Sequence, residues 1–410
     1  MLCGLLGQKL SHSYSPQIHK LLGSYSYELF EKEPEELKDF LTNGNFDGLN
    51  VTIPYKKAII PYCSTLSEQA KKLGSVNTIV KQRDGTLIGH NTDYFGFYTM
   101  ITSSGISVRD KKALILGSGG ASNTVQCVLS ELGAIPIIIS RSGENNYNNL
   151  SNHKDAQIIV NATPVGMYPN NGNSPLSLDN FPKLIAVYDL IYNPCRTELL
   201  QQAEKRSLVA VNGLQMLVAQ AKESAEWFTS SKMKDSVISD IYAKMKCQME
   251  NVVLIGMPGC GKSTIGKLLS VKLNRDFIDS DEEIIKIINM PIGKFISENG
   301  EAAFRKIETE VLREISKKSS IVIATGGGCV TQACNYPLLH QNSKIIWIER
   351  DISQLPTDGR PLSRQGSLQN LYTTRKPMYQ SFSDFTVVNQ TSAPNTVTQI
   401  LSNLTMEGAL

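Results

Sequence analysis

The chain has 410 residues, 41% of them hydrophobic and 19% charged, and a formal net charge of +3. This length fits two or three domains, and the hydrophobic content excludes global disorder. Basic and acidic side chains are mixed throughout, so no basic tract indicates binding to nucleic acid or to a membrane surface. No apolar run approaches the roughly 18 residues of a membrane span, and the N-terminal residues lack signal-peptide features. The eight cysteines show neither paired nor zinc-type spacing, so we expect a cytoplasmic protein without a disulfide framework.

The N-terminal residues contain short apolar runs, at 2–6 and 48–53, between polar helical stretches. Residues 76–89 are typical of a hairpin, because Arg83-Asp84-Gly85 supplies turn chemistry between two alternating runs.

From Lys111 onward, buried strands alternate with helical segments, which predicts a parallel, doubly wound sheet. The predicted strands are 113–116, 135–139, 157–160, 184–190 and 208–211, and an amphipathic helix is predicted over 214–228.

The polar segment 229–250 contains no strand pattern, and we place a domain boundary there. A second alternation of strands and helices follows it. Its predicted strands are 252–255, 277–279, 321–325, 345–348 and 385–388.

The glycine-rich turn Gly117-Ser118-Gly119-Gly120-Ala121-Ser122 follows an apolar strand and opens a helical segment. Such a turn lets the backbone approach a pyrophosphate at a helix N-terminus. At the end of the next strand, Ser140-Arg141 stands where an acidic residue would select NAD(H). A guanidinium can form two aligned bonds to a phosphate, which favours NADP(H). The alternatives are a plain glycine turn and a solvated surface arginine.

A second nucleotide motif, 256–264, follows the strand at 252–255 and is a complete phosphate-binding loop. In this motif Lys262 reaches the β- and γ-phosphates and the Ser263 hydroxyl ligates magnesium. Cys260 is expected to be a small loop residue and not a nucleophile. The loop alone leaves a GTPase, an ATPase and a small-molecule kinase open, although no guanine-reading Asn-Lys-x-Asp segment is present.

Several blocks in residues 1–230 resemble the signature of shikimate dehydrogenases, in order and at family spacing. They are Ser11-His12-Ser13-Tyr14-Ser15-Pro16, Asn50-Val51-Thr52-Ile53-Pro54-Tyr55-Lys56, Gly74-Ser75-Val76-Asn77-Thr78, Asn91-Thr92-Asp93, Asp189-Leu190-Ile191-Tyr192-Asn193-Pro194 and Gly213-Leu214-Gln215-Met216-Leu217-Val218-Ala219-Gln220. The resemblance implies a catalytic pair, Lys56 and Asp93, and a set of side chains that holds the polyhydroxy carboxylate substrate. Besides the pair, that set is Ser13, Ser15, Thr52, Asn77, Tyr192 and Gln220. Ser13 and Ser15 could instead cap a helix, and Asn77 could be a turn residue.

The residues expected to contact NADP(H) come from the glycine turn, the following strand end and two later blocks. They are Gly117, Ser118, Gly119, Gly120, Ala121, Ser140, Arg141, Leu190 and Gly213. The family often has a second basic residue beyond the position of Arg141. Here Glu144 follows instead, so the 2′-phosphate clamp rests on one arginine.

Residues 251–410 resemble shikimate kinases. The blocks that carry the resemblance, besides the phosphate-binding loop, are Phe277-Ile278-Asp279-Ser280-Asp281, Phe304-Arg305-Lys306-Ile307-Glu308, Ala324-Thr325-Gly326-Gly327-Gly328, Gly359-Arg360-Pro361-Leu362 and Arg375-Lys376-Pro377-Met378-Tyr379. The segment between Asp351 and Arg360 is shorter than the lid segment usual in the family.

The kinase resemblance also implies a role for each matched position. It implies that Asp281 orients the attacking hydroxyl and that Arg305, Arg375 and the Gly327 N–H hold the substrate. Lys262 and Arg360 would act on the transferring phosphoryl group. Gly259, Cys260, Gly261, Lys262, Ser263, Thr264 and Arg360 would contact ATP, and Ser263 and Asp279 would hold Mg²⁺. Asp279 and Asp281 could alternatively cap the next helix.

The expected fold is therefore α/β, with a two-lobed dehydrogenase that contains an NADP-binding Rossmann domain, followed by a P-loop domain like that of nucleoside monophosphate kinases. We expect a substrate-binding domain over 1–93 plus about 213–240, the NADP domain over 94–212 and the kinase domain over 251–410. The expected function is bifunctional: NADPH-dependent reduction of 3-dehydroshikimate to shikimate, then phosphorylation of shikimate by ATP. The alternative is a quinate/shikimate dehydrogenase fused to a degenerate or regulatory kinase domain. Small-molecule substrates are the only expected partners, and the oligomeric state is left open.

Overall fold

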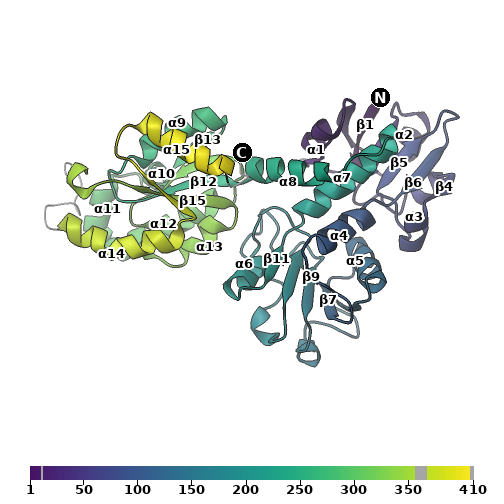
Figure 1. Ribbon diagram of the computed structural model, residues 1–410, viewed down its shortest axis with the longest axis horizontal. Helices are drawn as coiled ribbons and strands as arrows, with labels where there is room; N and C mark the ends of the chain where they lie inside the picture. The colour runs from purple at the N-terminus through teal and green to yellow at the C-terminus, as the bar shows by residue number, and fades with distance from the viewer. Residues whose placement is uncertain (11–12, 356–366, 407–410) are drawn as a thin grey trace. The chain divides into compact units, whose positions relative to one another are not determined.

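The computed structural model describes residues 1–10, 13–355 and 367–406 (Figure 1). The chain divides into two compact units. Unit 1 comprises Met1–Val165, Ser174–Tyr192 and Gln202–Met245, and unit 2 comprises Gly166–Asn173, Asn193–Gln201 and Lys246–Leu410.

The first sheet of unit 1 has six strands in the order β2-β1-β3-β5-β6-β4. These strands are β1 (Leu2–Gly7), β2 (Ser26–Glu31), β3 (Gly48–Val51), β4 (Thr65–Leu66), β5 (Thr78–Lys81) and β6 (Leu87–His90). The helices that accompany them are α1 (Ser15–Leu22), α2 (Leu37–Asn43) and α3 (Glu68–Leu73). β5 and β6 pair antiparallel, with Thr78 opposite His90, so the predicted hairpin is confirmed.

The second sheet of unit 1 has five strands, all parallel, in the order β11-β10-β9-β7-β8. The strands are β7 (Lys112–Leu116), β8 (Ile135–Ile139), β9 (Ile158–Asn161), β10 (Ala186–Asp189) and β11 (Val209–Val211). The accompanying helices are α4 (Asp93–Thr102), α5 (Gly120–Glu131) and α7 (Leu214–Thr229), and the division between the two units falls within α6 (Glu198–Lys205), after Gln201. A parallel sheet is covered on both faces, which is why its central strands read as continuous apolar runs. The predicted doubly wound sheet is confirmed.

The polar segment predicted to hold the domain boundary contains a helix, α8 (Ser236–Met249). Its buried side chains include Ile238, Ile241 and Met245, which recur at helical spacing. The division between the two compact units, after Met245, falls within this helix.

The sheet of unit 2 has five parallel strands in the order β13-β14-β12-β15-β16. They are β12 (Asn251–Ile255), β13 (Asp276–Asp279), β14 (Ile321–Ala324), β15 (Ser343–Glu349) and β16 (Phe385–Val388), which confirms the five predicted strands. The helices are α9 (Lys262–Leu273), α10 (Ser280–Ile288), α11 (Ile292–Asn299), α12 (Glu301–Ile315), α13 (Asn335–His340), α14 (Ser367–Phe382) and α15 (Ala393–Met406). Helices α9 and α15 lie on one face of this sheet, and α12, α13 and α14 lie on the other (Figure 1).

All eight cysteines are free thiols, and Cys334 is the exposed one among them. Within the described ranges, no helix is both long and apolar enough to span a bilayer.

Candidate active sites

The glycine turn after β7 forms an open cradle at the N-terminus of α5. Gly117 has a φ of +104°, a left-handed conformation that glycine adopts without strain, and its N–H donates to the Ile139 carbonyl at 2.8 Å. A Cβ atom at Gly119 or Gly120 would have no neighbour within 4 Å, so the backbone is accessible to a ligand. No side chain caps the helix and its first turn has no acidic residue. These features fit the pyrophosphate of a dinucleotide.

The loop after β8 presents Arg141 to solvent. The Ser140 hydroxyl accepts a hydrogen bond from the Gly143 N–H at 2.9 Å and shapes the loop, so it is engaged within the protein. Arg141 is exposed and forms no ion pair with any residue that the structure describes. Its guanidinium is therefore available to an anionic group.

Leu190 and Gly213 lie against each other near the end of β10. A Cβ atom at Gly213 would fall 2.1 Å from the Leu190 carbonyl oxygen, so only glycine allows this approach. The Gly213 N–H donates to the Ile191 carbonyl at 3.0 Å.

Lys56 and Asp93 form an ion pair, with 2.6 Å between Nζ and Oδ2. Lys56 lies in the turns after β3, and Asp93 is the first residue of α4. The side chains are 32% and 18% exposed, so the pair is half-buried but still accessible to a small molecule.

Next to Asp93, a buried network of polar side chains joins β3, β5 and α7. Asn77 accepts from the Thr92 N–H at 2.7 Å and donates to the Thr92 hydroxyl at 3.0 Å. The Thr92 hydroxyl also lies 3.5 Å from Gln220 Oε1 and 3.0 Å from Ser224 Oγ. Asn50 donates to the same Ser224 hydroxyl at 2.7 Å. The network thus connects Asn77 and Gln220 to Thr92, the residue that precedes Asp93.

Ser224, which the sequence analysis did not single out, is fully buried at the centre of this network. A serine inside an amphipathic helix carries no signal in one sequence, because serine is also common at positions without a polar partner.

The remaining predicted substrate residues lie on neighbouring elements. The Ser15 N–H donates to the Ser13 hydroxyl at 3.2 Å at the start of α1, so Ser13 does act locally on the backbone. Tyr192 packs edge-on against Tyr14 with ring centroids 6.0 Å apart, and burial raises the pKa of its phenol. Thr52 follows β3 and its N–H donates to the Leu6 carbonyl at 2.9 Å.

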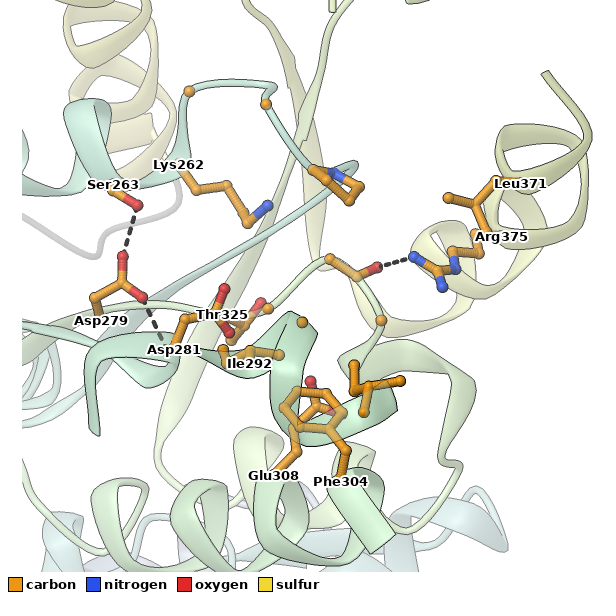
Figure 2. Close-up of a pocket in the computed structure, with 18 of the residues that line it drawn as sticks. Lys262, Ser263, Asp279, Asp281, Ile292, Phe304, Glu308, Thr325, Leu371 and Arg375 are labelled. Atoms are coloured by element: carbon orange, nitrogen blue, oxygen red, sulfur yellow. Dashed lines mark hydrogen bonds between the residues drawn. The ribbon is translucent and has the colours of Figure 1, made fainter. Parts of the chain in front are cut away.

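In unit 2, the phosphate-binding loop opens onto a cavity of about 630 Å³ at the carboxyl edge of the sheet (Figure 2). Gly256, Gly259 and Gly261 have φ values of +144°, +85° and +102°, so glycine is favoured at each position. The cavity is lined by the loop, by Asp279 and Asp281 and by the glycine segment after β14.

The loop lysine lies inside the phosphate-binding loop itself. Lys262 Nζ donates to the carbonyls of Gly256 and Met257, at 2.8 and 3.1 Å. Asn389, another residue that the sequence analysis did not identify, donates to the Cys260 carbonyl at 2.8 Å and holds the loop from β16.

Asp279 has two functions in the structure. Its Oδ1 accepts from the Asp281 N–H at 3.0 Å and caps α10, as the capping alternative predicted. Its Oδ2 accepts from the Ser263 hydroxyl at 2.6 Å (Figure 2). A hydroxyl beside one carboxylate fits Mg²⁺, which usually keeps several waters and completes its shell with substrate phosphates. Among the residues that the structure describes, no cluster of three or more His, Cys, Asp or Glu forms an all-protein metal site.

Arg305 is held between two glutamates on α12. Its Nη1 donates to Glu308 and its Nη2 to Glu301, both at 2.8 Å. Glu308 is fully buried, whereas the Glu301 side chain is 51% exposed. Burial raises the pKa of the Glu308 carboxyl, although Arg305 opposes the shift, and Glu308 Oε1 has no hydrogen-bond partner.

Arg375 reaches the same cavity from α14. Its Nη1 donates to the Gly327 carbonyl at 3.0 Å (Figure 2), and the buried Tyr379 hydroxyl donates to the same oxygen. Arg360 and the 359–362 block around it lie outside the described residues.

Comparisons with known proteins agree with this geometry. The family model "Shikimate dehydrogenase substrate binding domain" matches residues 5–79, and the model "Shikimate kinase" matches residues 258–405. The chain is 35% identical over 261 residues to a shikimate dehydrogenase (NADP(+)) of Clostridium beijerinckii, covering 58% of this chain and 96% of the relative.

Two solved structures resemble the N-terminal part. A chorismate mutase/shikimate 5-dehydrogenase fusion from Clostridium acetobutylicum is 35% identical with a TM-score of 0.57, over 60% of this chain and 97% of that chain. A shikimate 5-dehydrogenase from Thermus thermophilus, in complex with NADP(H) and shikimate, is 30% identical with a TM-score of 0.55, over 60% of this chain and 99% of that chain.

The two sites define an α/β oxidoreductase with a dinucleotide fold, joined to a P-loop kinase. The chain belongs to the shikimate dehydrogenase family and carries a shikimate kinase domain at its C-terminal end. It is a bifunctional enzyme of the shikimate pathway that uses NADP(H) and ATP.

Proposed function

We propose that Lys56 and Asp93 form the proton relay that accompanies reduction of the 3-keto group of 3-dehydroshikimate. NADPH supplies the hydride when bound. The Lys56 ammonium donates a proton to the oxygen on which negative charge develops, and the Asp93 carboxylate, 2.6 Å away, orients that ammonium. The Lys56 amine left after the transfer regains its proton from solvent water by way of Asp93. The ion pair between Lys56 and Asp93 is half-buried. Their attraction is therefore stronger than it would be in bulk water, because the local dielectric constant is lower.

The substrate ring is held by hydroxyl, amide and phenol groups. Ser13, Ser15, Thr52, Asn77, Tyr192 and Gln220 supply these groups. The network through Thr92 supports the roles of Asn77 and Gln220, since each side chain already has one partner that fixes its orientation. Fixed donors and acceptors favour one orientation of a polyhydroxy acid.

The residues that would hold the cofactor follow strands of the second sheet at their carboxyl ends. The backbone of 117–121 would hold the pyrophosphate and Arg141 the 2′-phosphate, while Leu190 and Gly213 would flank the nicotinamide end. The open cradle at Gly119 and Gly120 supports this assignment.

In the kinase site, Asp281 orients the hydroxyl that attacks. ATP supplies the phosphoryl group when bound. The backbone of 259–264 and Lys262 would hold the phosphates, and Ser263 and Asp279, whose oxygens share a hydrogen bond, would hold Mg²⁺. Arg360 is proposed to cover the transferring group.

The substrate carboxylate binds between Arg305 and Arg375, beside the Gly327 N–H. We infer that it takes the place of Glu301, whose side chain is exposed, and leaves the buried Arg305–Glu308 pair intact. This arrangement keeps the guanidinium fully paired before and after binding.

One observation carries the kinase proposal: Lys262, Asp281, Arg305 and Arg375 all line a single cavity. A domain that had lost activity would be under no constraint to keep these four groups together, so a purely regulatory kinase domain is disfavoured. A cytoplasmic location is supported by the eight free cysteines.

A coupled assay tests both activities in one experiment. The full chain is given 3-dehydroshikimate and NADPH, and then ATP with magnesium, while NADPH absorbance and ADP release are followed. Lys56→Met should abolish NADPH oxidation but leave ADP release at the wild-type level when shikimate is supplied directly. Asp281→Asn should do the reverse. If Lys56→Met oxidises NADPH at the wild-type rate, the proposed relay is wrong.

A further inference from the structure

The kinase cavity contains a fourth cation that the reaction scheme above does not use. Arg350 lines the cavity together with Lys262, Arg305 and Arg375. It is the residue directly after β15, and its Nε is buried without a hydrogen-bond partner.

The other three cations of the cavity all have partners. Lys262 donates to loop carbonyls, Arg305 to two glutamates and Arg375 to the Gly327 carbonyl. Arg350 forms no hydrogen bond or ion pair with any described residue. A buried guanidinium nitrogen without a partner is costly, so the arrangement indicates that a ligand supplies the missing acceptor.

The position of Arg350 indicates which ligand that is. β15 is the parallel neighbour of β12, with Ile255 opposite Trp347, so Arg350 lies beside the phosphate-binding loop that follows β12. A Cβ atom at Gly256 would fall 2.4 Å from the Ile348 carbonyl oxygen, which shows how closely the two strand ends approach.

A second contact links the same point to the other side of the loop. The Asn389 N–H donates to the Glu349 carbonyl, and the Asn389 side chain donates to the Cys260 carbonyl, both at 2.8 Å. Asn389 thus bridges, through hydrogen bonds, the backbone next to Arg350 and the phosphate-binding loop.

The two carboxylate-binding arginines contact a different segment of the cavity wall, the glycine segment after β14. Arg375 contacts the Gly327 carbonyl, and a Cβ atom at Gly328 would fall 2.2 Å from Arg305 Nη2. Both arginines therefore contact the glycine segment after β14, whereas Arg350 lies beside the phosphate-binding loop.

We propose that Arg350 binds the polyphosphate of ATP and is a nucleotide-affinity residue of the kinase site. This proposal rests on the kinase activity of the domain. A guanidinium forms two charge-assisted bonds to phosphate oxygens in a fixed geometry, which an ammonium does not reproduce.

The test compares Arg350→Gln with Lys267→Gln, in the full chain. Lys267 is an exposed lysine on α9 that does not line the cavity. Its substitution by glutamine removes one positive charge from unit 2, as Arg350→Gln does. Isothermal titration with magnesium and the non-hydrolysable analogue AMP-PNP measures affinity without turnover. Arg350→Gln should weaken binding by about tenfold or more, which is the loss expected for one charge-assisted interaction. Lys267→Gln should stay within about twofold of wild type.

Kinetics and a second variant separate the outcomes. In Arg350→Gln the KM for ATP should rise while the kinase KM for shikimate stays unchanged, and Arg350→Lys should lose less affinity than Arg350→Gln. Wild-type AMP-PNP affinity in Arg350→Gln would overturn the proposal, and so would a rise in the shikimate KM alone. Absence of shikimate-dependent ADP release in the wild-type chain would instead refute the kinase function. The AMP-PNP titration measures binding without turnover, so the two failures can be told apart. NADPH oxidation by each variant reports on the fold of unit 1, and the thermal transition of unit 2 reports on its own fold.

Discussion

Replacement of Arg305 by alanine is expected to destabilise unit 2. This loss of stability has to be separated from any effect of the substitution on substrate binding. The Arg305 side chain is 9% exposed and pairs with Glu308, which is fully buried. Without Arg305, an ionised carboxylate would remain in the interior, and breaking a buried pair in this way costs about 3–5 kcal/mol. The bond to the half-exposed Glu301 adds at most about 1 kcal/mol.

Arg305→Ala is therefore expected to lower the free energy of unfolding of unit 2 by about 4 kcal/mol, nearly all of it from the broken pair with Glu308. For a unit of this size, each kcal/mol lowers the midpoint by about 2–4 °C, so the midpoint should fall by roughly 10 °C. Differential scanning calorimetry of the full chain is the assay, with NADPH oxidation as the check that unit 1 is unaffected.

The double variant Arg305→Ala/Glu308→Gln tests the cause. Glutamine keeps the shape of Glu308 without its charge, so the double variant should be more stable than Arg305→Ala alone by about 2–3 kcal/mol. If the effects of Arg305→Ala and Glu308→Gln on the free energy of unfolding were strictly additive, the buried carboxylate would not be the cause of the lost stability. A raised kinase KM for shikimate is then interpretable in the double variant, and an unchanged KM there would mean that Arg305 does not bind the substrate carboxylate.

Three further predictions concern unit 1. Arg141→Ala should bring the kcat/KM values for NADPH and NADH close together, from a preference of about thirtyfold for NADPH, mainly by weakening NADPH; an unchanged preference would mean that the 2′-phosphate is read elsewhere. Burial lowers the pKa of His90 to about 4 from 6.5. Between these pH values His90 binds a proton in the unfolded chain but not in the folded chain, so its contribution to stability falls as the pH drops, by about 2 kcal/mol between pH 7 and pH 5. His90→Phe keeps the ring on Trp227 and should show a smaller difference between its urea midpoints at pH 7 and pH 5; an equal difference would assign the effect to other groups. Ser224→Ala should lower the urea midpoint by an amount equivalent to about 1–3 kcal/mol, because Asn50 loses its 2.7 Å acceptor, and no change would show that water replaces the hydroxyl.

Much of the fold could be predicted because parallel strands are buried on both faces and read as short apolar runs. β7 and β12 are examples, and both lie directly before a glycine turn that the sequence also reveals. β2 was not predicted, because its six residues alternate weakly and all of them remain partly or wholly exposed at the edge of the sheet. Helix α8 was also missed, because its buried residues are separated by Lys, Ser and Asp.

The site residues show the same limit at the level of single side chains. Motif spacing predicts a role for Arg305 but none for its partner Glu308, since a glutamate three residues further along a helix is usually a solvated surface residue. Ser224 and Asn389 act through hydrogen bonds with residues far away in the chain, and no local pattern encodes such contacts. Asp279 could be assigned either as a helix cap or as a metal-shell residue, and the geometry shows that one carboxylate can cap the helix and bond to Ser263 at once.

The distribution of thiols along this chain has a practical consequence for chemical labelling. Burial raises the pKa of Cys3, Cys195 and Cys329 to about 12 and that of Cys63 to about 11, so these groups carry almost no thiolate at neutral pH. Cys334, just before α13, is exposed. A maleimide dye added at neutral pH should therefore attach first at Cys334, in the native sequence and without any cysteine being removed. The enzyme thus has a natural attachment point for a single fluorophore in the kinase half, from which nucleotide binding could be followed in real time.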